Sequence, residues 1–203
     1  MEQIKASTLL TALRRKHAAD AVVREVVMDD PFEHAYRRRA EVERIRKYSG
    51  DIHAERMRVR YVEQGKAVAD ELPEGWDYRT STPQRRIDAL VLASTGITAV
   101  EIKVSRADFR RETEQKRRAW RAVTNRFVYL TPVGLLLPSE IPTGCGLWEF
   151  DPDTVGRGSW QHGIKAAKKA TVAKEPNPLP FQITRALAYR VSRAEAASEK
   201  ANR

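Results

Sequence analysis

The sequence predicts an α/β protein built around a mixed β-sheet that is flanked by helices. Two apolar runs rich in β-branched residues, 85–93 and 97–104, are separated by a short Ser-Thr-Gly segment (94–96), which predicts a β-hairpin. From Ser105 onward the apolar residues recur at helical spacing. The apolar run 126–132 then predicts a further strand, so that strands and helices alternate along the chain.

A helix and a strand precede this hairpin. Ser7 is a candidate N-cap, and leucine residues follow it at helical spacing, which predicts a helix over about residues 7–18. Residues 21–28 are rich in valine, whose branched side chain favours extended backbone. We therefore expect a strand there.

The region from about residue 30 to residue 80 interrupts the α/β plan as a helical insertion. Its apolar residues recur at helical intervals, namely Phe32, Ala35, Tyr36, Val42 and Ile45. Gly50 interrupts the pattern, and a second helix is expected over about 52–70. Residues 72–84 are rich in turn-forming residues and predict a connecting loop.

The elements after the hairpin complete the predicted order. Ser105 and Asp108 fit a Ser-x-x-Asp capping box at the start of a single helix. Residues 146–150 predict a short last strand. Residues 151–180 contain several Gly and Pro and little periodicity, so an irregular surface segment is expected. Apolar residues at helical spacing over 181–198 predict a closing helix.

The chain carries a strong excess of positive charge. Its 203 residues have a formal net charge of +10 at pH 7 and a pI of about 9.9. Lys and Arg outnumber acids nine to four over 37–60, seven to three over 106–121, and eight to one over 157–193. Such an excess favours a polyanionic partner such as nucleic acid, with an anionic membrane surface as the weaker alternative.

The composition also excludes several classes of protein. The single cysteine, Cys145, excludes an internal disulfide framework and a multi-cysteine zinc site. No apolar run approaches the roughly 20 residues that cross a bilayer, and the start MEQIKAST lacks the apolar segment of a secretory signal. We therefore expect an intracellular protein.

Three ionisable residues lie within the apolar runs of the predicted hairpin. Asp88 belongs to the first strand, and Glu101 and Lys103 belong to the second. Side chains alternate along a strand, so Glu101 and Lys103 project from one face while Val100 and Ile102 face the opposite layer. An acid and a lysine in mid-strand are costly unless they are paired or bind something. Asp88 on the neighbouring strand can reach the same patch.

This group of residues suits metal-assisted chemistry on a phosphate. Two converging carboxylates offer a hard divalent cation the oxygen ligands that it prefers, and the carbonyl of Ile102 is a candidate third ligand. Lys103 can orient or deprotonate an attacking water and can stabilise negative charge that develops on a phosphate. The alternative interpretation of the spacing is a salt bridge among Asp88, Glu101 and Lys103 with no catalysis.

The pattern Asp88-x12-Glu101-Ile-Lys103 resembles the core motif of the PD-(D/E)xK nuclease superfamily. The block RRIDALVLASTGITAVEIKVSRADFRRE, followed by a basic helix and the strand RFVYLTP, more specifically resembles the MmcB-like DNA-repair family and related small phage nucleases. The resemblance covers about 7–28 and 84–150 and, loosely, 174–190.

The resemblance implies a fold with a restriction-endonuclease-like core in αβββαβ order. This core would occupy residues 1–150, including the insertion at about 30–80, and a basic extension with the closing helix would occupy 151–203. The insertion has no counterpart in the compact relatives.

The resemblance also implies a role for each residue of the motif. Asp88 and Glu101 would be ligands of Mg²⁺ or Mn²⁺, Lys103 would be the catalytic lysine, and Glu25 is the best candidate for an additional acid. Ile87 stands where the motif name has Pro, which is a departure from the pattern. The insertion contains further acids that compete with Glu25 for its role, namely Glu41, Glu43, Glu63 and Glu71.

The activity implied is hydrolysis of DNA phosphodiester bonds in repair, recombination or phage DNA processing, in the cytoplasm of a bacterial or phage-infected cell. Candidate contacts to DNA phosphates are Arg37, Arg38, Arg39, Arg106 and Lys116; such contacts carry position rather than sequence information. The first three belong to the insertion, which either grips the substrate or is a helical pair that only covers a sheet edge. None of the three is expected to be needed for folding. The alternatives are a non-catalytic DNA-binding protein on the same fold and an RNA-directed nuclease.

Overall fold

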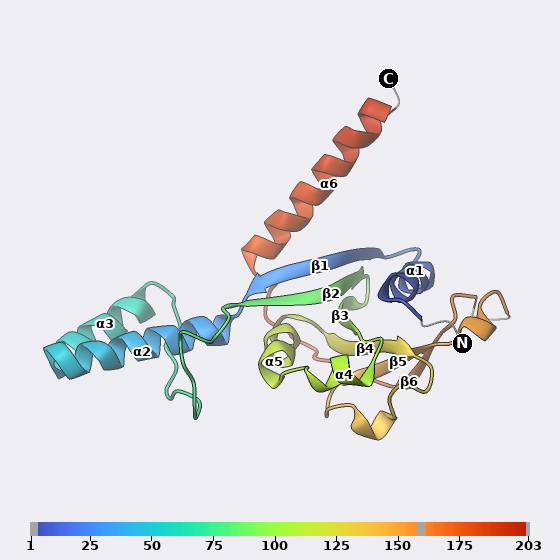
Figure 1. The fold of residues 1–203 in the computed structure, drawn as a ribbon. Helices are drawn as coiled ribbons and strands as arrows, with labels where there is room; N and C mark the ends of the chain where they lie inside the picture. Colours follow the sequence, from blue (N-terminus) through green and yellow to red (C-terminus); the bar gives the residue numbers. More distant parts are fainter. Residues whose placement is uncertain (1–3, 158–160, 202–203) are drawn as a thin grey trace. The chain divides into compact units, whose positions relative to one another are not determined.

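The computed structural model describes residues 4–157 and 161–201, which contain one six-stranded sheet and several helices (Figure 1). The strands are β1 (Ala21–Asp29), β2 (Gln84–Ala93), β3 (Gly96–Ile102), β4 (Arg126–Pro132), β5 (Gly146–Phe150) and β6 (Ile164–Lys168). The helices are α1 (Ala6–Lys16), α2 (Pro31–Ser49), α3 (Asp51–Glu63), α4 (Arg106–Arg110), α5 (Glu114–Val123) and α6 (Phe181–Ala201), with short 3-10 turns at Pro138–Glu140 and Pro152–Thr154.

The sheet is mixed, which confirms the predicted α/β class. Its strands lie side by side in sequence order. The pairs β2–β3 and β5–β6 are antiparallel, whereas β3–β4 and β4–β5 are parallel. Parallel neighbours need a crossover connection, and α4 and α5 supply the one between β3 and β4. The helical segment after the hairpin is therefore part of the sheet's architecture.

The predicted hairpin is confirmed as β2 and β3. Ala93 pairs with Gly96, and the ladder ends at the pair Ala89–Val100. Gly96 has a φ of 119°, and a Cβ at this position would lie 2.4 Å from Oδ1 of Asn125. Glycine is required here because both the backbone conformation and the space exclude a side chain.

A buried cluster beneath α1 forms the part of the core nearest the hairpin. Leu9 and Leu13 of α1 join Val100 and Ile102 of β3 and Leu130 of β4 in this cluster. Val100 and Ile102 therefore pack into the layer expected for the side of β3 that does not carry Glu101 and Lys103.

The helix predicted to continue from Ser105 is in fact two helices. Ser105 caps α4 as expected, because its Oγ accepts from the N–H of Asp108 at 3.1 Å. Thr113 then caps α5, with its Oγ1 accepting from the N–H of Lys116 at 3.4 Å. A second capping residue inside the segment competes with the helical hydrogen bonds and breaks the helix.

Two further expectations need correction. Residues 151–180, predicted to be irregular, contain β6, which pairs antiparallel with β5. The sequence IKAAK has a weak strand propensity, so pairing with β5 and burial of Ile164 decide its conformation. The helix expected over 52–70 ends earlier, at Glu63. The closing helix is confirmed as α6.

The chain divides into two compact units, 1–27 with 86–203 and 28–85. Segment 151–203 thus falls in the same unit as α1 and the β2–β3 hairpin, and β6 extends their sheet. Within the described ranges 4–157 and 161–201, no helix combines the length and apolar character needed to cross a membrane.

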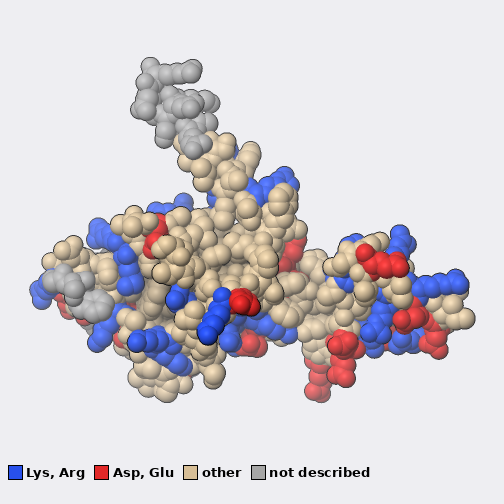
Figure 2. All heavy atoms as spheres, turned by 180° about the vertical axis from the view of Figure 1, so that it is seen from behind, with Lys and Arg blue, Asp and Glu red and all other residues tan. Residues whose placement is uncertain are grey.

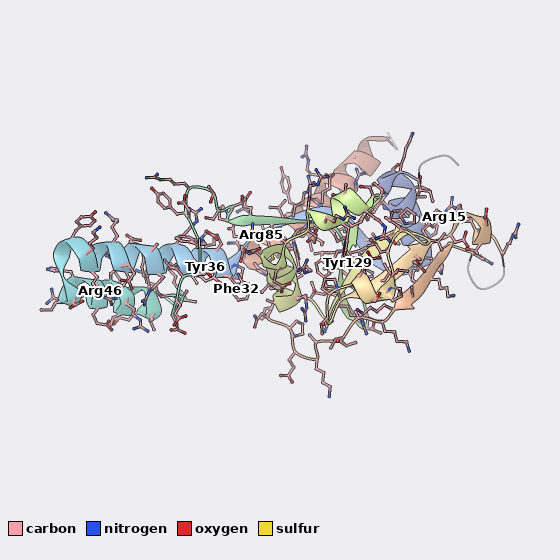
Figure 3. All side chains as sticks on the ribbon, turned by 60° about the horizontal axis from the view of Figure 1, so that its bottom comes forward. Arg15, Phe32, Tyr36, Arg46, Arg85 and Tyr129 are labelled. Atoms are coloured by element: carbon pink, nitrogen blue, oxygen red, sulfur yellow. The ribbon has the colours of Figure 1, made fainter. Side chains whose placement is uncertain are left out.

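The unit formed by 28–85 is the insertion, in which α2 and α3 pack against each other. Asp30 caps α2 by accepting from the N–H groups of Phe32 and Glu33. The same carboxylate accepts from Nε of Arg85, which is labelled in Figure 3, at 2.9 Å. The entry and exit of the insertion are therefore joined by a partly buried ion pair. Gly50, with a φ of 88°, separates the two helices as expected.

Candidate active site

Asp88 and Glu101 lie on neighbouring strands where the β2–β3 ladder ends. The last backbone pair is Ala89–Val100. Beyond it the N–H of Ile102 donates to Oδ2 of Asp88 at 2.8 Å. The carboxylate thus replaces the backbone acceptor that the ladder no longer supplies. Both carboxylates line one pocket, as the sequence predicts.

Lys103 is buried between two glutamates. Its Nζ lies 2.9 Å from Oε1 of Glu101 and 2.8 Å from Oε2 of Glu112, and the three side chains are 6%, 3% and 3% exposed. Nζ of Lys116 lies 2.5 Å from Oε1 of Glu101 and 3.8 Å from Oε2 of Glu112. Two lysines and two glutamates therefore form a charge cluster, in which each buried charge has an opposite partner.

The charge cluster alters the proton affinity of its members. Burial, followed by the nearby carboxylates of Asp88 and Glu112, raises the pKa of Glu101 although both lysines oppose this. Burial lowers the pKa of Lys103, but Glu101 and Glu112 outweigh burial and raise it to about 12. Lys103 is therefore a cation at neutral pH. As a cation it is suited to stabilising negative charge.

A pocket of about 480 Å³ lies over these groups. Its charged lining comprises Glu25, Asp88, Glu101 and Asp108 together with Arg24, Arg86, Lys103 and Lys116. Opposite charges thus meet in one place, as expected for a ligand that contains both a divalent cation and a phosphate.

Glu25 reaches this pocket through an unusual backbone conformation. Its φ is 50°, and within 4–157 and 161–201 it is the one residue other than glycine with a positive φ. Successive side chains of a regular strand point to opposite faces, yet Arg24 and Glu25 both line the pocket. The left-handed conformation interrupts the alternation of β1, as irregular residues in strands do near functional sites.

Oxygen atoms remain available for a metal ion in the pocket. Oε2 of Glu101 is buried without a hydrogen-bond partner, which is costly for an acceptor. The carbonyl of Ile102 lies on the same edge of β3 as its N–H, which bonds to Asp88. Mg²⁺ is often held by one or two carboxylates and completes its shell with water. Asp88, Glu101 and Ile102 could hold such an ion, although in the described part of the chain no three His, Cys, Asp or Glu residues gather closely enough to enclose one.

Two of the predicted phosphate contacts, which lie in the unit formed by 1–27 and 86–203, have acidic partners. Lys116 lines the pocket but is paired with Glu101 in the charge cluster. The guanidinium of Arg106 lies 2.5 Å from Oε1 of Glu140 and is not part of the pocket lining. Arg106 is therefore oriented by η1, the 3-10 turn Pro138–Glu140.

The arginines of the insertion serve its internal structure. Arg37 bonds to Glu33 at 3.1 Å and to the carbonyl of Ser81 at 2.9 Å. Arg38 donates to a carbonyl in the loop after α3, and Arg39 pairs at 2.6 Å with the glutamate four residues later. Whether any of the three is needed for folding stays a prediction, but the bonds that connect Arg37 of α2 to the following loop indicate a structural role for this residue. Figure 2 shows acidic and basic side chains interleaved over this unit.

Three residues that belong to the site were not predicted from the sequence. Glu112 lies between α4 and α5, where a run of mixed charges hides one buried acid. Arg86 precedes Asp88 by two residues on the same strand, so the alternation of side chains could have placed it on the same face. Arg24 gave no signal, because it reaches the pocket only through the irregular backbone at Glu25.

Comparisons with known proteins do not identify a family. No family model matches the chain, and no curated protein matches it. Among solved structures, the SPO1766 protein of unknown function from Silicibacter pomeroyi is similar, with 21% sequence identity and a TM-score of 0.40. The match covers 56% of this chain and 70% of that one. This similarity is too weak to bear on function.

Proposed function

We propose that the pocket is the active site of a metal-dependent nuclease of PD-(D/E)xK type, on a restriction-endonuclease-like core, that hydrolyses DNA phosphodiester bonds. One observation carries the proposal. Asp88 and Glu101 converge at the end of a ladder beside a buried lysine, and Oε2 of Glu101 is buried without a partner. Such an arrangement is costly for stability alone and becomes favourable when a cation is bound.

Each residue of the pocket has a distinct role in this proposal. Asp88, Glu101 and the carbonyl of Ile102 hold Mg²⁺ or Mn²⁺, and Glu25 offers a further carboxylate. When bound, the cation activates a water and neutralises charge on the phosphate. Lys103 remains protonated and stabilises the negative charge that develops on the phosphate oxygens.

Glu112 supports this chemistry through Lys103. Its carboxylate accepts from Nζ at 2.8 Å and fixes the ammonium group beside Glu101. Because both side chains are buried, the position of the charge is set before the substrate binds.

Arg24 and Arg86 are the proposed contacts to the phosphates next to the scissile one. Both are exposed arginines that line the pocket beside carboxylates. Guanidinium groups bind phosphate oxygens in a bidentate manner. Lys116 pairs with Glu101. If Glu101 turns away from Lys116 to bind a cation, Lys116 becomes available as a further phosphate contact. The net charge of +10 supports a polyanionic substrate, and the resemblance to DNA-repair and phage nucleases favours DNA.

The non-catalytic alternative, a salt bridge among Asp88, Glu101 and Lys103, is supported in part. Glu101 pairs with Lys103, whereas Asp88 accepts from the N–H of Ile102. A salt bridge alone does not explain why Asp88 and Glu25 line the same pocket or why Oε2 of Glu101 lacks a partner. We therefore favour the enzyme.

The test is a substrate panel. Purified protein is incubated with single-stranded, duplex, flapped and four-way DNA and with matched RNA, each with Mn²⁺ and with a chelator. We expect metal-dependent cleavage of at least one DNA form and weaker cleavage of RNA. Binding without cleavage in every Mn²⁺ reaction would support the non-catalytic alternative, and preferred cleavage of RNA would support the RNA-directed one.

A further inference from the structure

Arg190 of α6 contacts the irregular segment of β1 directly. One terminal nitrogen of its guanidinium donates to the carbonyl of Arg24 at 2.7 Å, and the other donates to the carbonyl of Glu25 at 3.1 Å. The second of these residues, Glu25, is where β1 departs from regular strand geometry. Arg190 itself is exposed and does not line the pocket.

The two hydrogen bonds select one conformation of β1. Successive carbonyls of a regular strand point toward opposite neighbouring strands, so one planar guanidinium cannot donate to both. The φ of 50° at Glu25 turns the carbonyls of Arg24 and Glu25 toward one side, where Arg190 reaches both. The same conformation brings both side chains to the pocket.

We propose that Arg190 is a positioning residue for the site. It stabilises the irregular form of β1, in which Glu25 and Arg24 face the pocket, and it thereby couples α6 to the binding of metal and phosphate. This inference rests on the proposed function, because it assigns Arg190 the task of holding a ligand that the nuclease uses. Without Arg190, β1 regains the alternation of a regular strand and the carboxylate of Glu25 leaves the pocket.

The test measures Mn²⁺ affinity of the full chain by calorimetry. Arg190→Ala should weaken the affinity by about 10-fold, the lower end of the range for groups that orient metal ligands. Arg190→Lys should behave like Arg190→Ala, because an ammonium group does not reproduce the paired geometry of the guanidinium. Arg185→Ala is the matched control, since Arg185 is an exposed arginine on the same helix and should leave the affinity unchanged.

A double variant separates a positioning role from a general loss of charge or structure. Glu25→Ala should weaken Mn²⁺ binding, and adding Arg190→Ala to it should cause no further loss, because both changes remove the same carboxylate. Three results would each overturn the role of Arg190 without refuting the proposed nuclease function. These are additive losses in the double variant, equal losses in Arg190→Ala and Arg185→Ala, and wild-type affinity in Arg190→Ala or in Glu25→Ala. A wild-type protein that binds no Mn²⁺ would instead refute the proposed function.

Discussion

The N–H of Ile102 donates to Oδ2 of Asp88 at 2.8 Å across the end of the β2–β3 ladder. One oxygen of the carboxylate thus completes the hydrogen bonding of a backbone group, and Asp88 also lines the pocket. This relationship ties a candidate metal ligand to the strand that carries Glu101. It also gives Asp88 a structural role that experiments can separate from its chemical one.

Asp88→Asn should separate these roles. The amide keeps an oxygen that can accept from Ile102, so we expect a melting temperature within about 2 °C of wild type. Asp88→Ala loses the hydrogen bond, at a cost of about 1 kcal/mol, which lowers the melting temperature by about 2–4 °C. Both variants should lose Mn²⁺ binding in calorimetry, because neither has the carboxylate. Wild-type Mn²⁺ affinity in Asp88→Asn would exclude Asp88 as a ligand.

Lys103→Met should destabilise the protein strongly. The change leaves Glu101 and Glu112 buried together without the cation between them, and removing one partner of a buried ion pair costs about 3–5 kcal/mol. Urea unfolding at pH 7 measures this loss. Adding Glu112→Gln removes one uncompensated charge and should recover part of the stability. A double variant no more stable than Lys103→Met would show that Glu112 does not interact with Lys103.

The sequence was most informative about the strands, where side chains alternate between the two faces and one face is buried. Asp88, Glu101 and Lys103 stood out because charged residues interrupt two apolar strands, and a hairpin with a short turn leaves little freedom of register. The same regularity predicted the hairpin, β4, β5 and the side of β3 that packs beneath α1.

Features that depend on distant partners were not predictable from local pattern. Glu112 becomes a buried ion only because the helix is interrupted before Thr113, which places the side chain of Glu112 beside Lys103. β6 has little propensity of its own and forms by pairing with β5. The φ of Glu25 is matched by two hydrogen bonds from Arg190, which lies 165 residues away in sequence.

The conformation of Glu25 makes a prediction about stability. Left-handed backbone costs a residue with a Cβ about 1–2 kcal/mol, which exceeds the roughly 0.5–1 kcal/mol that glycine loses through its flexibility. We therefore expect Glu25→Gly to be more stable than Glu25→Ala by about 0.5–1 kcal/mol in urea unfolding. Val27 is the matched control in β1, since it is exposed and has no positive φ. There the glycine variant should be the less stable one, and the same order at both positions would contradict the left-handed conformation.

The insertion requires a different test from a triple change of Arg37, Arg38 and Arg39, because Arg37 holds the loop after α3. Arg44 and Arg58 are exposed on α2 and α3, so Arg44→Ala with Arg58→Ala should leave the melting temperature unchanged. If the insertion grips DNA, this pair should weaken binding and lower the slope of log affinity against log salt by about 0.9 per lost phosphate contact. Arg37→Ala should instead lower stability. If the double variant of Arg44 and Arg58 binds DNA with unchanged affinity and salt slope, the insertion does not grip DNA and has only a structural role.

The most direct test of the account is the cleavage rate of labelled DNA by Glu101→Gln. Glutamine keeps the size of the side chain but lacks the negative charge that a divalent cation requires. We expect Mn²⁺-dependent cleavage by wild type, none with a chelator, and a rate at least about 100-fold lower in Glu101→Gln, with DNA binding retained. Cleavage by Glu101→Gln at the wild-type rate would contradict the assignment of this pocket as the active site.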